Sequence, residues 1–145
     1  MSEQYDLVVI GGGSGGLAAA QRAAEYGARV ALVESGPLGG TCVNVGCVPK
    51  KIMWNGAELG GALLDAPGYG FELEVVGHDW AYLRHHRDAY IHRLNGIYAA
   101  NLAKRHVELV RARATFRDAH TVIAGARTLT AAQVLIATGG RPLLP

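Results

Sequence analysis

The feature that most constrains the fold of this chain is a run of glycines in residues 11–16, placed directly after an apolar stretch. Residues 7–10 read Leu-Val-Val-Ile, which is typical of a strand buried on both faces of a parallel sheet. Gly11, Gly13 and Gly16 then match the pattern G-x-G-x-x-G. In that pattern the first glycine allows a tight turn, the second lets the backbone approach a pyrophosphate, and the third lets the next helix pack on the strand.

The segment after the glycines predicts the rest of a β-α-β unit. We expect an alanine-rich helix over residues 17–26, stopped by Gly27, and a second buried strand over residues 30–33. Glu34 ends that strand about 20 residues on, where an acidic side chain accepts hydrogen bonds from ribose hydroxyls. The unit therefore predicts a dinucleotide site. It does not separate FAD from NAD, but Glu34 would repel the 2′-phosphate of NADP at this site.

The middle of the chain reads as helical. We predict a helix from near Cys42 into the fifties, with Pro49 in an early turn, where proline costs least. Residues 60–77 read as irregular, and Asp79 as the N-terminal cap of a long helix. Large side chains recur along that second helix at helical spacing, namely Leu83, Arg87, Tyr90, Leu94, Tyr98 and Leu102.

The last part of the chain has a β pattern. The strands expected there are 107–112, 121–123, 127–130 and 133–137, with turns at 118–120 and 124–126. The predicted fold class is α/β: a Rossmann-like domain, residues 1–145, with a mostly parallel sheet, a helical excursion and a β-meander.

Composition and charge exclude several classes of protein. Half of the 145 residues are hydrophobic and the net charge is only +2, with basic residues scattered over 84–117, so no nucleic-acid partner is predicted. Apolar runs end well before the roughly 18 residues of a membrane span. Glu3 and Asp6 replace the positive charges of a secretory signal. We therefore expect a cytoplasmic protein.

Cys42 and Cys47, separated by four residues, suggest chemistry rather than a structural staple. One alternative is zinc, which generally takes four ligands, but there are only two cysteines and the histidines at 78, 85 and 86 are distant, so no metal is predicted. Another is a pair of inert buried thiols. The favoured hypothesis is a redox-active disulfide, because a helix start beside Lys50 and Lys51 favours thiolate.

The cysteines lie in a segment that is similar to a known signature. Residues 39–51, Gly-Gly-Thr-Cys-Val-Asn-Val-Gly-Cys-Val-Pro-Lys-Lys, resemble that of the flavoprotein disulfide reductases of the pyridine-nucleotide family. Residues 137–140, Ala-Thr-Gly-Gly, resemble the second FAD-contacting turn of that family. Within it the chain looks most like the glutathione reductases, because Lys50-Lys51 stands where lipoamide and mercuric enzymes typically have Ser-Lys. Residues 87–90 and 93–98 also resemble the glutathione reductase helix.

The resemblance implies roles for individual residues. Cys47 would be the thiol nearest the flavin and Cys42 the thiol that attacks the substrate disulfide. Lys50 would sit near the flavin N5, although related enzymes place the flavin lysine at Lys51. The residues expected to bind FAD, from the glycine pattern and the resemblance together, are Gly11, Gly13, Ser14, Gly15, Gly16, Glu34, Gly40, Thr41, Cys42, Lys50, Thr138 and Gly139.

The resemblance also implies a substrate site for glutathione disulfide. The residues that would line it are Ser14, Arg22, Ile97, Tyr98 and Asn101. Gln21 departs from the family, some of whose members have arginine there. Without the resemblance, Ile97 and Tyr98 would read as core residues and Arg22 as a solvated helix residue.

The implied function is the FAD-binding, disulfide-bearing part of an NADPH-dependent glutathione-disulfide reductase that works as a homodimer. NADPH would bind to a domain that is not in this chain, and the chain alone would be inactive. The alternatives are another flavoprotein disulfide reductase, of trypanothione, mercuric or lipoamide type, and a non-catalytic nucleotide-binding fragment.

Overall fold

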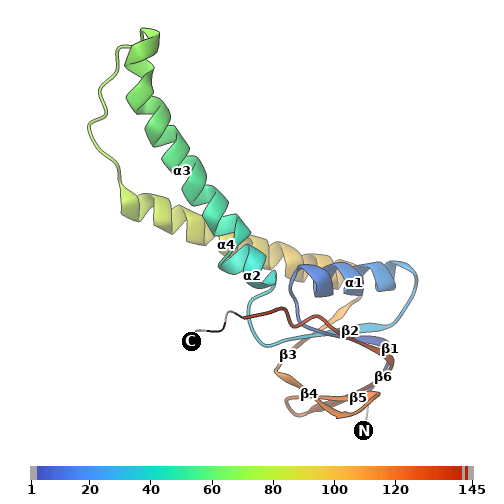
Figure 1. Cartoon of the computed structure of the whole chain (residues 1–145). Coiled ribbons are helices and arrows are strands. Elements are labelled where there is room, and N and C mark those ends of the chain that lie inside the picture. Colours follow the sequence, from blue (N-terminus) through green and yellow to red (C-terminus); the bar gives the residue numbers. More distant parts are fainter. Residues whose placement is uncertain (1–2, 142, 144–145) are drawn as a thin grey trace.

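The strand, glycine turn, helix and second strand expected at the N-terminus are all present. The computed structural model of the protein describes residues 3–141 and 143. Its elements, in chain order, are β1 (Glu3–Ile10), α1 (Ser14–Glu25), β2 (Val30–Glu34), α2 (Gly40–Asn44), α3 (Cys47–Asp65), the 3-10 helix η1 (Ala66–Tyr69), α4 (Trp80–Lys104), β3 (Glu108–Arg111), β4 (Ala114–Asp118), β5 (Thr121–Ala124) and β6 (Arg127–Ile136) (Figure 1).

The strands form one sheet in the order β3-β2-β1-β6-β5-β4. β1 pairs in parallel with β2 and β6, and β2 with β3, whereas β5 is antiparallel to both β4 and β6. The predicted α/β class, with a mostly parallel sheet and a meander, is therefore confirmed.

Two β predictions were wrong. β6 is one strand rather than two, because its first residues pair with β5 and residues 129–136 pair with β1, so hydrogen bonds hold the whole length extended. β4 was missed because its residues are largely polar and exposed. Pairing with β5, rather than a buried face of its own, makes it a strand.

The sheet buries apolar side chains on both faces, as expected for its parallel part. All four apolar residues of β2, Val30 to Val33, are almost completely buried. One face packs against the meander, with Val8 and Val33 beside Val122. The other lies under α1 and the C-terminal part of α4, where Leu32 meets Leu102. Packing on both faces of the sheet holds the ends of the strands, and the loops that follow them, in fixed positions.

The helical excursion is larger than expected. α3 leads away from the sheet and α4 runs back to it, and the two helices diverge toward the segment that connects them (Figure 1). The helix expected to start near Cys42 is broken at Val45–Gly46 into α2 and α3, and α3 then continues to Asp65 instead of becoming irregular at residue 60. Its glycines at 60 and 61 do not end it, because no proline follows until Pro67.

The cap of α4 is confirmed. Oδ1 of Asp79 accepts a hydrogen bond from the backbone N–H of Tyr82 at 2.9 Å. Of the side chains at helical spacing on α4, Leu102 is buried, but Tyr90 is 41% exposed because that part of the helix has left the sheet. Across the described residues, no helix combines the length and the apolar character that a membrane crossing needs.

Candidate functional site

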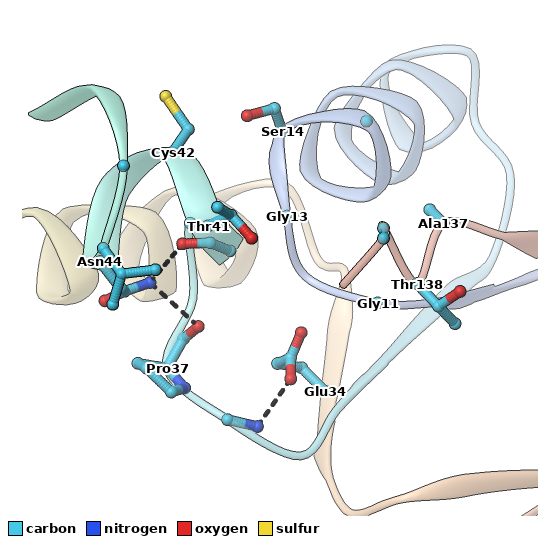
Figure 2. A pocket seen from close by; sticks show the side chains of 18 of the residues that line it. Gly11, Gly13, Ser14, Glu34, Pro37, Thr41, Cys42, Asn44, Ala137 and Thr138 are labelled. Carbon is cyan, nitrogen blue, oxygen red and sulfur yellow. Dashed lines mark hydrogen bonds between the residues drawn. The ribbon is translucent and has the colours of Figure 1, made fainter. Parts of the chain in front are cut away.

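A pocket of about 710 Å³ lies at the carboxyl ends of β1, β2 and β6 (Figure 2). Ligands of parallel α/β sheets bind at this edge, outside the carboxyl ends of the strands. Three segments enclose the pocket: the glycine loop after β1, the segment from Glu34 through α2 to the start of α3, and residues 137–141 after β6. Pairing of β6 with β1 brings the last segment beside the first, although more than a hundred residues separate them.

At some positions of the glycine loop the fold requires a glycine, and at others an added side chain would project into open space. Gly11 has φ +108°, and a Cβ there would lie 2.3 Å from the carbonyl oxygen of Ala137. A Cβ on Gly16 would lie 1.8 Å from the carbonyl oxygen of Gly11. A Cβ on Gly13 would contact only Gly40, at 3.7 Å, and one on Gly15 would meet nothing.

α1 begins at Ser14, three residues earlier than predicted. Its N-terminal cap is Gly13, which offers no side-chain hydrogen bond to the first turn. The N–H groups of that turn are thus left to a ligand, and the helix dipole adds partial positive charge beside Ser14 and Gly15, which line the pocket. This arrangement suits a phosphate.

Glu34 holds two turns of the pocket wall at once. Its Oε2 accepts from the backbone N–H of Gly12 at 2.7 Å. Its Oε1 accepts from that of Gly36 at 2.6 Å, the bond drawn to Glu34 in Figure 2. Each carboxylate oxygen has a second lone pair, so the side chain can still accept from a ligand hydroxyl. The sequence predicts the ligand role of Glu34 but not its bonds to the loop.

The two cysteines lie on different helices and line the same pocket. Cys42 is on α2 and is half-buried, while the exposed Cys47 is the first residue of α3. A Cβ on Gly46, between the helices, would lie 2.8 Å from the carbonyl oxygen of Thr41, so the bend requires a glycine. The cysteines thus face the space above the glycine loop from the opposite wall.

The effect predicted for the nearby lysines is present at Cys42, but in the reduced pair other contacts outweigh it. The hydrogen bond to Cys47 raises the pKa of the Cys42 thiol above its ordinary value, and partial desolvation adds to this. Lys50 lowers that pKa, but its effect is smaller. Within the described residues, no three His, Cys, Asp or Glu side chains are grouped so as to hold a metal ion.

A sequence profile describing the pyridine nucleotide-disulphide oxidoreductases matches residues 5–145. The chain belongs to this family. Among its relatives are the glutathione reductases of Yarrowia lipolytica, 48% identical over 97% of the chain, of Schizosaccharomyces pombe, 49% identical over 100%, and of Nostoc sp., 48% identical over 100%. The chain covers 33%, 33% and 32% of them, so it spans about a third of the length of these curated relatives. The predicted family is therefore confirmed.

Most of the residues that this chain was predicted to use for FAD lie together. Those lining the pocket are Gly11, Gly13, Ser14, Gly15, Glu34, Gly40, Thr41, Cys42, Thr138 and Gly139, and Cys47 joins them. Gly16 instead packs beneath the loop. Lys50 is exposed on α3, one turn after Cys47, and it is the lysine whose charge acts on Cys42.

The residues predicted to bind glutathione are more dispersed. Ser14 lines the main pocket, whereas Arg22 is exposed, pairs with Glu25 and lines a shallow hollow along α1. The other three lie on α4: Ile97 is 41% exposed, Tyr98 packs against the core under α1, and Asn101 is half-buried.

Part of the pocket wall is formed by residues that were not predicted from the sequence. A second hollow of about 390 Å³ adjoins the first beyond Glu34 and is lined by residues 112–114 between β3 and β4. No local pattern marks these residues, because only the pairing of β3 with β2 brings them to Glu34. Asn44 and Arg141 of the main pocket were also missed. Asn44 lies inside the recognisable cysteine segment, which was the available signal.

Proposed function

We propose that this chain is the FAD-binding and disulfide-bearing part of an NADPH-dependent glutathione-disulfide reductase. The observation that carries the proposal is that Cys42 and Cys47 line the same pocket as the glycine loop. A dinucleotide held on that loop would extend toward the cysteine pair. The glutathione reductases among the relatives support the choice of substrate.

The residues of the pocket fit FAD. A side chain on Gly13 would project into open space that a pyrophosphate could occupy, with the first turn of α1 behind it. Glu34 would accept from the ribose, which directs the adenine toward residues 112–114. Thr41, Thr138 and Gly139 would hold the remainder of the cofactor. When bound, FAD would supply the two electrons that reduce the cysteine pair.

The cysteines then carry out two exchange steps. The Cys42 thiolate attacks one sulfur of glutathione disulfide, which forms a mixed disulfide and releases one glutathione thiolate. The Cys47 thiolate attacks Sγ of Cys42, which releases the second glutathione and restores the Cys42–Cys47 disulfide. Arg22 would attract the anionic substrate, because its side chain is 70% exposed.

The relatives are about three times as long as this chain. We therefore assign NADPH binding to regions of the protein outside these 145 residues. By the same resemblance, we propose that the enzyme is a cytoplasmic homodimer.

Purification of the naturally expressed protein tests this function. We expect a bound flavin spectrum and reduction of glutathione disulfide with NADPH in preference to NADH. A parallel panel of trypanothione disulfide, lipoamide and mercuric ion separates the related activities. Absence of flavin would refute the cofactor, and faster turnover of another substrate would refute glutathione disulfide.

A further inference from the structure

Two asparagine side chains connect α4 to the wall of the pocket. Nδ2 of Asn95, on α4, donates to the carbonyl oxygen of Leu38 at 2.7 Å and to Oδ1 of Asn44 at 3.0 Å. Nδ2 of Asn44, the last residue of α2, donates to the carbonyl oxygen of Leu38 at 3.1 Å. It also donates to that of Gly40 at 2.9 Å, a bond drawn in Figure 2. Both amides therefore bind the short turn that leads into α2.

That turn needs support from outside. α2 has only five residues, and an isolated helix of that length is unstable. Its N-terminal cap, Gly39, and its first residue, Gly40, are both left-handed, with φ +100° and +59°, and the cap offers no side-chain hydrogen bond. Val43 is its buried residue. The two asparagine amides, together with the 2.8 Å bond from the N–H of Gly39 to the carbonyl oxygen of Gly12, are thus the polar contacts that hold the start of α2.

α4 also supports the helix that carries the other cysteine. Leu83 of α4 lies against Gly56 of α3, where an added Cβ would be 3.2 Å from the leucine side chain. Nη1 of Arg87 lies 3.8 Å from the sulfur of Met53. α4 therefore contacts both cysteine-bearing helices: it is joined to the α2 segment by the Asn95 amide and to α3 by side-chain packing.

We propose that Asn95, acting through Asn44, is a positioning residue that sets the reduction equilibrium of the Cys42–Cys47 pair. This rests on the proposed function only in taking the pair to be redox-active. Oxidation joins the two Sγ atoms and releases two electrons and two protons. Because it is favoured when the two sulfurs are held within reach of each other, loosening α2 lowers their effective concentration. The disulfide then becomes easier to reduce.

The equilibrium is measured in the naturally expressed protein, without oxygen, in buffers of 2-mercaptoethanol and hydroxyethyl disulfide. Two molecules of the thiol reduce the protein disulfide and are themselves joined as hydroxyethyl disulfide. After alkylation and trypsin, residues 30–50 form one peptide that holds both cysteines. Its mass reports two blocked thiols or none. We expect Asn95→Ala to be reduced about tenfold more readily, a shift of about 30 mV for this two-electron couple.

Two variants control for general effects. His92→Ala changes an exposed residue of α4 and should leave the equilibrium unchanged. Leu83→Ala weakens the contact between α3 and α4 beside Gly56, away from Asn95. If it moves the equilibrium as much as Asn95→Ala does, loss of stability alone explains the effect and the proposal is refuted.

Asn95→Asp keeps the shape of the side chain but removes the N–H donors of the amide. This variant replaces Asn95→Ala in the test if Asn95→Ala does not fold. A shift below twofold in a folded variant refutes the positioning role. In a double-mutant cycle with Asn44→Ala, the two effects should not add, because both residues belong to one network. The peptide readout requires neither flavin nor glutathione, so failure of the proposed function would appear separately as missing flavin or turnover.

Discussion

The backbone N–H of Gly12 and the carboxylate of Glu34 are joined by a hydrogen bond of 2.7 Å, which ties the end of β2 to the glycine loop. The residue expected to bind the ribose therefore also shapes the loop that we propose binds the phosphates.

Replacement of Glu34 should affect both stability and cofactor. Glu34→Ala leaves the N–H groups of Gly12 and Gly36 without their acceptor, so we expect a loss of about 1–3 kcal/mol in the free energy of unfolding together with loss of flavin. Urea unfolding and the flavin-to-protein absorbance ratio measure the two effects. Glu58→Ala, at an exposed position of α3, is the control. A flavin-loaded Glu34→Ala protein of normal stability would contradict this role.

The glycines of the loop should fail in different ways. Gly13→Val should fold, because the backbone there is extended and the new Cβ meets only Gly40, but the side chain should block FAD. Gly16→Ala should prevent folding, because its Cβ would overlap the carbonyl oxygen of Gly11. Circular dichroism and flavin content separate these outcomes. Normal flavin occupancy in folded Gly13→Val would remove the pyrophosphate assignment.

The two cysteines should differ in their spectra. In the proposed arrangement, Cys42→Ser leaves Cys47 as the free thiol next to the flavin, and we expect a long-wavelength charge-transfer absorption band. Cys47→Ser should lack the band. Absorption spectra of both purified variants across neutral and alkaline pH make the comparison. A reversed pattern would exchange the proposed roles.

The reactivity of Cys42 should depend on its neighbour. Because the bond to Cys47 raises the pKa of Cys42, the thiolate fraction at neutral pH is small and alkylation should accelerate as the pH rises toward that pKa. In Cys47→Ala the bond is absent, so the midpoint should move to lower pH. Lys50→Met should move the midpoint in Cys47-containing protein to higher pH, because Lys50 lowers the pKa of Cys42. Iodoacetamide rates on the reduced protein measure the midpoint, and an unchanged value in Cys47→Ala would contradict the assigned cause.

Local signals predicted much of the fold. The apolar runs became β1 and β2, Gly27 ends α1 with φ +86°, and Asp79 caps α4, because each depends on residues adjacent in the chain. The extent of α3, the strand β4 and the continuity of β6 were not predictable in this way. Each is decided by a partner element or by the lack of one.

The site divides along the same line. The glycine loop with Glu34, and the segment with both cysteines, are contiguous motifs, so the residues that we propose for the chemistry could be picked out from the sequence. Only the tertiary structure placed residues 137–141 and 112–114 around them, through the pairing of β6 with β1 and of β3 with β2. It alone brought Asn95 to Leu38 and Asn44. A hydrogen bond between residues more than fifty positions apart leaves no local periodicity or spacing, because it depends on the packing of α4 on the core and not on the neighbouring sequence.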